Sequence, residues 1–293
     1  MIVSASRRTD IPSCYADWFF NRVEAGFVDI RNPMNFNQTR RVALTPGAVD
    51  GIVFWTKNPA PMLNRLGLLR EYQYYFQFTV TPYGRDIEPA VPHKSTETIQ
   101  TFQRLSDIIG AGNVIWRYDP ILLSAKYTID YHTRAFEKIA KALHCHTHKV
   151  TVSFIDSHYK SVKNNMDKLG LVDFTQQTRA NLASTLAAIA QSYGLAIDAC
   201  AEEADLQSHG IGAAACVDPA RFKNPLSQDP LSQKIKKDKN QRKACGCASS
   251  IDIGMYNTCI NGCLYCYANY IQKASAANYV KHNYQSSFLV DGS

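Results

Sequence analysis

Long apolar stretches are missing from this sequence. No segment approaches the roughly 18 uninterrupted apolar residues that a transmembrane helix requires, so the sequence predicts no contact with a membrane. The N-terminus, MIVSASRRTDIP, also lacks the basic start and long apolar run of a secretory signal peptide. Both absences favour a cytoplasmic location, where cysteines serve as metal ligands or reactive thiols rather than as disulfides.

Charged residues are modest in number, at 19% of the chain, and internal repeats are absent. With 45% hydrophobic residues the composition is that of a soluble globular protein. Of the formal charge of +7, much lies in KIKKDKNQRK (Lys234–Lys243), which has six basic residues and one Asp. This stretch is interpreted either as a solvated basic loop or as a strip that contacts phosphates.

Cysteine, in contrast, is plentiful and unevenly placed. Seven of the nine cysteines lie from Cys200 onward, and Cys259, Cys263 and Cys266 fall within eight residues. A loop with this spacing can turn three sulfurs toward one point, and thiolates favour zinc or an iron–sulfur cluster. Structural zinc sites use four ligands, whereas a cubane held by three thiolates keeps one iron open. The loop therefore predicts a redox cluster, with structural zinc as the alternative.

A second set of four thiols consists of Cys200, Cys216, Cys245 and Cys247. If they converge, they could hold an auxiliary [4Fe–4S] cluster or a zinc ion. Cys14 and Cys145 have no thiol neighbours in the sequence and are interpreted as core or surface cysteines.

Short β-branched or aromatic runs alternate with longer helical stretches, which predicts a parallel α/β fold. The runs are followed by polar residues, as at the carboxyl ends of barrel strands, where active sites lie. Among these residues, Lys57, Arg117 and Asp119 are the candidate catalytic groups, and Thr79 and Glu88 the candidate cofactor-binding groups. Arg and Lys suit carboxylate or phosphate, and the carboxylates suit hydroxyl groups.

The C-x3-C-x2-C spacing, with Tyr265 before the last cysteine, resembles the signature of radical S-adenosylmethionine (SAM) enzymes. That resemblance implies a [4Fe–4S] cluster on the three thiols, SAM on its open iron with Tyr265 near the adenine, and a 5′-deoxyadenosyl radical that abstracts hydrogen. It also implies a reducing partner such as flavodoxin or ferredoxin, and it favours iron for an auxiliary site. Those enzymes carry the cysteine loop after the first strand, whereas here it comes last.

We therefore expect a partial parallel (β/α) barrel in circularly permuted order, in which Ser250–Tyr256 pairs beside Ile2–Ser6. The expected divisions are a barrel core at 1–199, an irregular cysteine- and lysine-containing segment at 200–249, and a βα unit with the cluster loop at 250–293. The permutation is physically inexpensive because chain termini often lie close together at a domain surface.

Several further segments extend the resemblance over nearly the whole chain. Together with the C-terminal stretch, they resemble a bacterial family labelled as a domain of unknown function: SASRRTDIP, VFWTKNP, FTVTPYGRDIEP, WRYDPI and SFID. More distantly, the CYCYAN end and the TVTPYGRDIEP and WRYDPI segments are similar to spore photoproduct lyase.

The sequence thus predicts an enzyme that uses SAM and a cluster for radical modification or repair of a substrate. The basic charge and the lyase likeness favour a nucleic acid or nucleotide as that substrate. Two other hypotheses stay open, a zinc-stabilised nucleic-acid-binding protein without catalysis and an iron–sulfur electron-transfer protein.

Overall fold

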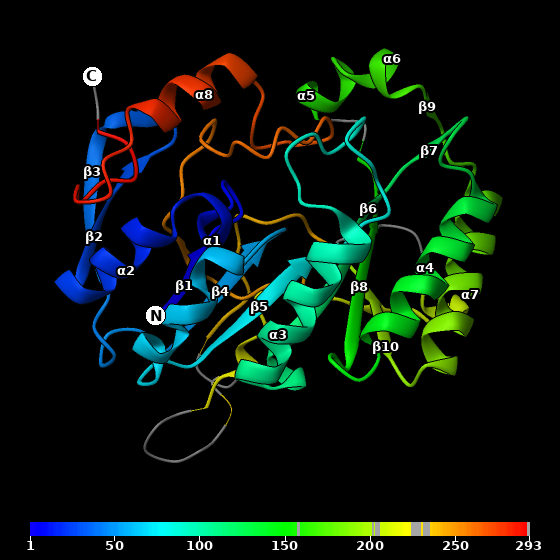
Figure 1. Cartoon of the computed structure of the whole chain (residues 1–293), viewed down its shortest axis with the longest axis horizontal. Helices are drawn as coiled ribbons and strands as arrows, with labels where there is room; N and C mark the ends of the chain where they lie inside the picture. Colours follow the sequence, from blue (N-terminus) through cyan, green and yellow to red (C-terminus); the bar gives the residue numbers. More distant parts are fainter. Residues whose placement is uncertain (157–158, 201, 203–205, 224–229, 231–234, 292–293) are drawn as a thin grey trace.

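A computed structural model describes residues 1–156, 159–200, 202, 206–223, 230 and 235–291 (Figure 1). Its centre is an eight-stranded sheet in which every neighbouring pair is parallel. From edge to edge the strands are β12 (Ile251–Asp252), β1 (Ile2–Ala5), β4 (Gly51–Thr56), β5 (Tyr74–Thr79), β6 (Val114–Ile121), β8 (Lys149–Phe154), β10 (Ala196–Ala199) and β11 (Gly212–Ala213). The predicted α/β class is confirmed.

The strand order has a simple relation to the chain. From β1 to β11 the strands of this sheet follow each other in sequence, and only β12 is out of order, before β1. The predicted neighbours therefore pair, with Val3 opposite Ile251 and Ser4 opposite Asp252. Within the described residues β11 and β12 are edges that no ladder joins, so the sheet is open.

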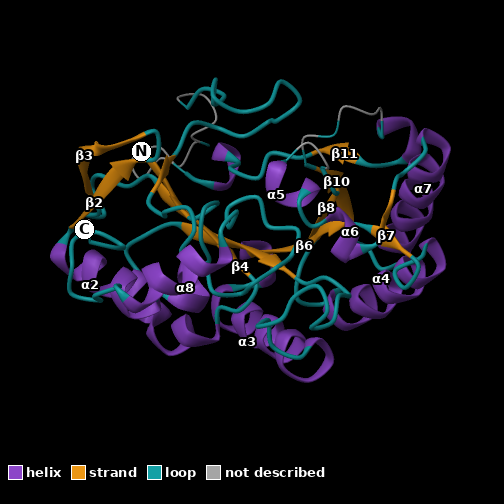
Figure 2. Cartoon of the chain, turned by 90° about the horizontal axis from the view of Figure 1, so that it is seen from above, coloured by secondary structure: helices purple, strands orange, loops and turns teal. Residues whose placement is uncertain are grey.

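Parallel strands in chain order send their right-handed crossovers in one direction, which places the helices on one face. Figure 2 shows this layer along one side of the sheet. Its longer helices are α2 (Ala16–Ala25), α3 (Ile99–Ile109), α4 (Ile129–Leu143), α7 (Gln176–Ser192) and α8 (Gln272–Val280). Other helical segments are a 3-10 helix (Ala60–Leu69), a π-helix (Lys94–Thr98) and the short helices α1 (Ile11–Cys14), α5 (Lys160–Lys163) and α6 (Met166–Leu169).

The two faces of the sheet have different cores because side chains alternate along each strand. Toward the helices lie buried apolar residues such as Phe54, Phe76 and Trp116. The other face is apolar at the start of the strands, where Val53 and Tyr75 pack under residues 214–223 and 235–248, which we call the covering segment. The next positions on this face are polar, and the functional residues stand there.

A smaller antiparallel hairpin, β2 (Phe27–Asn32) with β3 (Asn35–Ala43), lies beside the C-terminal end of the described chain (Figure 1). The backbone N–H of Asp29 donates to the carbonyl of Ser287 over 2.9 Å and joins the two. A second small ladder pairs β7 (Leu123–Ser124) with β9 (Leu171–Val172).

Two predicted elements are shorter than expected. The strand predicted at Ser250–Tyr256 ends at Asp252, because its carboxylate turns back to accept from the N–H of Gly254 over 3.0 Å. The helix of the βα unit expected at 250–293 begins only at Gln272, after the N–H of Ile271 has bonded to the Asn257 side chain over 3.1 Å. The segment expected to be irregular contains β11.

Candidate functional site

The loop that follows β12 holds Cys259, Cys263 and Cys266, which we call the loop thiols. Cys259 and Cys263 are each only 9% exposed. Neighbouring elements fix the loop. The Tyr15 hydroxyl donates to the carbonyl of Thr258 over 2.6 Å, and the N–H of Leu264 donates to the carbonyl of Ile87 over 3.0 Å. The loop is therefore held from two sides, near the carboxyl ends of β1 and β5.

The loop thiols lie within electrostatic reach of each other. The pKa of the Cys266 thiol is raised to about 11, mainly by burial and next by the neighbouring Cys259. Burial also raises the pKa of Cys263 well above its usual value, although the cation of Lys57 acts in the opposite direction. Cys259 and Cys263 are buried and Cys266 is half-buried, and a bound cation or cluster would supply the positive charge that favours their ionisation.

One thiol neighbour was missed by sequence reasoning. Cys14, at the end of α1, forms a thiol–thiol hydrogen bond with Cys259, and this bond is the largest cause that raises the pKa of Cys259. Cys14 packs against the core, as its interpretation as a core cysteine predicts, and in addition it has a thiol neighbour in Cys259. The two residues are 245 positions apart, so only the pairing of β12 beside β1 reveals the contact. Cys145 is exposed.

Glu88 is the electrostatic centre beside this loop, and its side chain is fully buried. Its carboxylate accepts from Lys57 Nζ over 2.8 Å, from Thr81 Oγ1 over 2.7 Å, and from Lys94 and Tyr265. Burial alone would raise the pKa of Glu88, but Lys57 and Lys94 outweigh it and hold the pKa at about 2. The predicted residues Lys57, Glu88 and Tyr265 are thus brought together.

A second buried carboxylate that the sequence reasoning missed ties Lys57 to the thiol loop. Asp10 accepts from the backbone N–H of Lys57 over 2.8 Å and from the Asn261 amide over 3.0 Å. It also caps α1 by accepting from the N–H of Ser13 over 3.0 Å. The sequence signal was present, because Asp followed within two residues by Pro is a typical helix start.

Cys200, Cys216, Cys247 and Cys245, which we call the inner thiols, are also brought together. The sulfurs of Cys200 and Cys216 are 3.2 Å apart. Cys216 further bonds to Cys247, which bonds to Cys245, so the four thiols form a continuous row. They converge because Cys200 follows β10 while the other three belong to the covering segment on the same face of the sheet.

Arg117 and Asp119 form a pair that supports the inner thiols. Arg117 donates from Nη1 to the Cys216 sulfur over 3.0 Å and from Nε to Asp119 over 3.0 Å. Asp119 also accepts from Ser153. Burial would raise the pKa of Asp119, but Arg117 and the Ser153 hydroxyl lower it below its usual value. The guanidinium is thus engaged on all its nitrogens with protein groups.

Trp55 packs against the cluster that contains the inner thiols, and its ring lies 5.2 Å from the guanidinium carbons of both Arg7 and Arg117. Arg7 follows β1, and thiols Cys247 and Cys216 are the main groups that raise its pKa against the effect of burial. Its Nη2 is buried and has no hydrogen-bond partner among the described residues. The Oδ1 of Asn269, next to the thiol loop, is also buried and has no hydrogen-bond partner among the described residues.

These two atoms provide a test of whether a bound group fits the site. A buried donor or acceptor without a partner is costly in a native structure, so each calls for an explanation. A bound group next to Arg7 would supply an acceptor for its Nη2, and a bound group next to Asn269 would supply a donor for its Oδ1. The residues present therefore fit a bound group next to the loop thiols.

The roles predicted for Thr79 and for the basic stretch stay predictions. Thr79 ends β5 opposite Arg117 but has no side-chain hydrogen bond within the described chain, and Thr81 bonds to Glu88 in its place. Lys234 lies outside the described residues. Of the rest of that stretch, Arg242 pairs with Asp156 at 3.3 Å, and Lys237 donates to the carbonyl of Lys243 over 2.6 Å.

The metal content of both thiol sets stays a prediction. In the described ranges no three His, Cys, Asp or Glu side chains are arranged to hold a single metal ion. Nor is any helix of those ranges long and apolar enough to pass through a bilayer.

Comparisons with known proteins add the family. Residues 2–268, a range that contains both thiol sets, match the family described as a domain of unknown function (DUF1848). The chain belongs to this family. No curated protein matches the sequence. Among solved structures, one that matches is Rhizobium etli pyruvate carboxylase T882A, crystallized without acetyl coenzyme-A, with 14% sequence identity and a TM-score of 0.27. The match covers 94% of this chain and 28% of the carboxylase chain.

Proposed function

We propose that this DUF1848 protein is a radical SAM enzyme that starts the radical modification or repair of a nucleic acid or nucleotide. The observation that carries the proposal is the loop of three thiols, two buried and one half-buried, beside the ion-paired Glu88, at the carboxyl edge of a parallel sheet. In this proposal Cys259, Cys263 and Cys266 hold a [4Fe–4S] cluster, which leaves one iron for SAM.

The proposal includes the fold type. In it, the open sheet is a partial (β/α) barrel in circularly permuted order. Its support is the position of β12 next to β1, which puts the last βα unit where a first unit would stand. A barrel-type site at the carboxyl ends of the strands would then contain Lys57, Asp119 and the loop thiols.

When bound, the cluster and SAM would supply a carbon radical capable of hydrogen abstraction, and the protein's own residues would position and shield the reactants. Glu88 keeps Lys57 charged and orients the Tyr265 ring, since its oxygens accept from both. Lys57 also lies over the Tyr265 ring, at 5.3 Å from the centroid. The hydrophobic surroundings, which include Tyr83 and Ile87, exclude water from this part of the site.

On the substrate side, Arg7 takes the anion-binding role first assigned to Arg117. All the nitrogens of Arg117 are engaged with Asp119, Gln77 and Cys216, so in the proposal this arginine positions the inner thiols. Arg7 retains a buried N–H group without a hydrogen-bond partner among the described residues, and its guanidinium lies over the Trp55 ring. A substrate carboxylate or phosphate would satisfy that donor.

The inner thiols are proposed as the ligands of a second [4Fe–4S] cluster. The convergence of these thiols supports this proposal, because four cysteines that are distant in sequence form one row on the face of the sheet opposite the helices. Two cations, Arg7 and Arg117, lie next to this row and would offset the charge of thiolates.

The decisive experiment measures iron, acid-labile sulfide and zinc after anaerobic purification. The variants are the triple C259A/C263A/C266A, the quadruple C200A/C216A/C245A/C247A, and C145A as an exposed-thiol control. We expect about eight irons in wild type and C145A and about four in each set variant, given four irons per cubane. The dithionite-reduced wild type should convert SAM to 5′-deoxyadenosine, and the triple variant should not.

Other outcomes would assign the protein differently. Stoichiometric zinc without sulfide would end the radical proposal in favour of a nucleic-acid-binding protein. Iron and sulfide without 5′-deoxyadenosine would favour electron transfer.

A further inference from the structure

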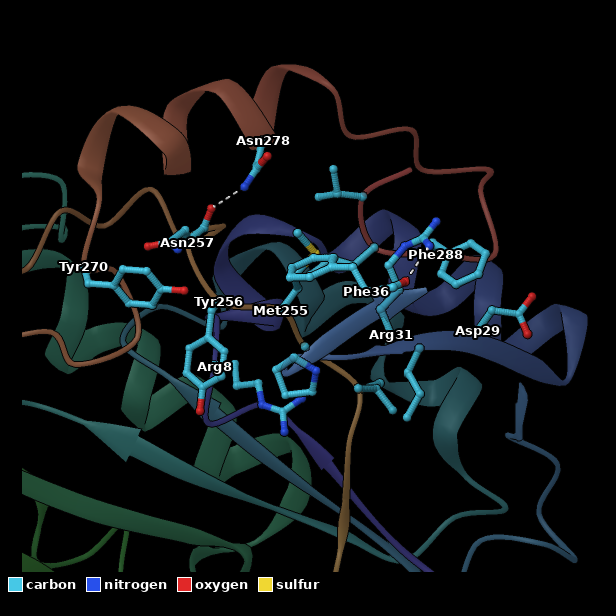
Figure 3. Close-up of a pocket in the computed structure, with 16 residues that line it drawn as sticks. Arg8, Asp29, Arg31, Phe36, Met255, Tyr256, Asn257, Tyr270, Asn278 and Phe288 are labelled. Atoms are coloured by element: carbon cyan, nitrogen blue, oxygen red, sulfur yellow. Dashed lines mark hydrogen bonds between the residues drawn. The ribbon is translucent and has the colours of Figure 1, made fainter. Parts of the chain in front are cut away.

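A second site is formed in part by the residues that follow β12. It is a pocket of about 100 Å³ between the hairpin β2–β3, the residues after β12, α8 and the C-terminal segment (Figure 3). An apolar cavity of about 150 Å³ admits benzene, so the space is of the order that one aromatic ring needs. Ile253, Met255 and Leu289 provide apolar lining.

The pocket has an excess of positive charge. The guanidinium of Arg8 has no hydrogen bond or ion pair within the described chain, and its one contact of this kind is with the Tyr256 ring, 5.3 Å away. Arg31 donates to the carbonyl of Phe36 over 3.3 Å but has no carboxylate partner. The one acidic residue of the lining, Asp29, is already neutralised by two hydrogen bonds from Arg41 at 2.8 and 2.9 Å. An anionic group would complete the charge balance of the pocket.

The wall beside Arg8 is aromatic and carries unused amide groups. The rings of Tyr256 and Tyr270 are in contact, with centroids 6.3 Å apart, and Tyr270 is 56% exposed. The Asn278 amide donates to the carbonyl of Asn257 over 2.9 Å. That leaves Nδ2 of Asn257 and Oδ1 of Asn278 without partners in the described chain. Figure 3 shows both asparagines along the same pocket.

We propose that this pocket binds a nucleotide. The anion that Arg8 lacks would be its phosphate, because a guanidinium pairs with phosphate in a fork geometry. The tyrosine wall would stack its base, and the free amide donor and acceptor would contact the base edge. Charge, aromatic wall and amide groups occur together here, and a plain anion or a plain apolar ligand would use only part of them.

The position of the pocket connects it to the proposed reaction. Tyr256 stands three residues before Cys259, and Arg8 follows Arg7, which faces the inner thiols. The inference rests on the proposed function, which gives the reason why a nucleotide would bind here. In the proposed reaction the pocket would hold the substrate nucleotide or a nucleotide next to it in a strand. The binding itself needs neither cluster nor SAM.

The test is isothermal titration of the anaerobically purified full chain with uridine 5′-monophosphate at one fixed ionic strength. Excess SAM is present, so that an adenosine site is filled. Loss of a charge-assisted hydrogen bond should raise the Kd of R8Q about tenfold or more, and loss of stacking should do the same for Y270L. R40Q, an exposed arginine of the same hairpin, and Y284L, an exposed tyrosine, serve as matched controls and should stay within about twofold of wild type.

Three further probes identify the chemistry and source of the ligand. Uridine and inorganic phosphate should each bind at least about tenfold more weakly than the nucleotide, because each uses half of the site. A short single-stranded oligouridylate should also be titrated. If it binds more tightly than the nucleotide, with the same losses in R8Q and Y270L, the ligand of the pocket is a nucleotide within a nucleic-acid strand. Weaker binding of the oligonucleotide would identify a free nucleotide.

The proposal is overturned if wild type binds no nucleotide at millimolar concentration. It is also overturned if R8Q and Y270L bind like wild type, or if phosphate alone binds as tightly as the nucleotide. Because 5′-deoxyadenosine formation is measured separately, failure of the pocket and failure of the radical proposal give different results.

Discussion

Glu88 shows how single residues define this site. Its fully buried carboxylate compensates two lysines that are themselves mostly buried, with exposed side-chain fractions of 13% for Lys57 and 20% for Lys94. Because the pKa of Glu88 is about 2 in the folded chain and 4.5 in its reference state, its contribution to stability is present above pH 4.5. It is lost as the pH falls toward 2.

Replacement of Glu88 by Gln should therefore destabilise the protein by about 3 kcal/mol, since it leaves two buried cations without their counter-ion. Urea unfolding at neutral pH measures the free energy. Glu24→Gln removes an exposed carboxylate and should change stability by at most about 0.5 kcal/mol. An E88Q protein as stable as the E24Q control would contradict the role given to this carboxylate.

His132 is a second residue whose protonation matters, and it is fully buried. Its Nε2 lies 2.7 Å from the carbonyl of Leu122, and its Nδ1 lies 2.8 Å from the Tyr118 hydroxyl. A neutral ring can donate from Nε2 and accept at Nδ1, so both bonds are satisfied without a charge. Burial lowers the pKa of His132 from 6.5 to about 4, although the Leu122 carbonyl opposes this effect.

Since the unfolded chain binds this proton at higher pH than the folded chain, stability is complete above pH 6.5 and is lost as the pH falls toward 4. Wild type should lose roughly 3 kcal/mol more than His132→Asn between pH 7 and pH 4, given 1.36 kcal/mol per pKa unit. Urea unfolding across this range measures the difference. His148→Asn, at an exposed histidine, should follow the wild-type pH dependence. Parallel curves for wild type and H132N would refute the assignment.

At the scale of elements, the contact of β12 with β1 holds the thiol loop in place. Asp252 accepts from Ser4 Oγ at 3.0 Å, Ser6 Oγ at 2.6 Å and the N–H of Arg7 at 2.8 Å. Gly254 passes close to the same residues, and a Cβ added there would lie 2.0 Å from Ser6 Oγ. The approach of the two chain segments requires glycine.

Gly254→Ala should therefore push β12 and the thiol loop away from β1, at a cost of about 1–3 kcal/mol for overpacking. The urea midpoint should fall. The control is Gly47→Ala, because a Cβ added there would have no atom within 4 Å. Equal midpoints for the two variants would show that the β12–β1 contact accommodates the added methyl group without loss of stability.

At the scale of the whole molecule, the two ends of the chain complete one fold. Leu289 and Val290 belong to the core on the helix face of the sheet. The indole N–H of Trp18 donates to the carbonyls of Ser286 and Phe288 over 3.0 and 3.1 Å. The C-terminal part therefore stabilises α2 and β1 as well as carrying the loop thiols.

A chain that ends at Ser249 should consequently lose cooperative unfolding. It would lack β12, the Tyr15 and Trp18 acceptors and part of the core. Near-UV circular dichroism and a urea titration compare it with the intact chain. A sharp transition in the shortened chain would mean that residues 1–249 fold without the final βα unit.

The sequence by itself determined the α/β class, the position of most strands and the pairing of β12 with β1. Alternation of apolar runs with helical stretches, together with turn residues, encodes the class and the strand positions locally. The pairing of β12 with β1 is what the resemblance to radical SAM enzymes implies, because those enzymes carry the cysteine loop after the first strand. The sequence also singled out both thiol sets, because the spacing of the loop thiols and the number of the inner thiols can be read from it directly. Lys57, Glu88 and Tyr265 were found because polar residues follow strands or belong to the cysteine loop.

Only the tertiary structure decided which groups meet. Cys14 beside Cys259, the row of inner thiols, the engagement of Arg117 and the free N–H of Arg7 all join residues from distant segments. The nucleotide pocket likewise combines Arg8, the hairpin and α8. Such contacts depend on how the sheet brings its strand ends and covering segment together, and no local pattern in the sequence records that arrangement.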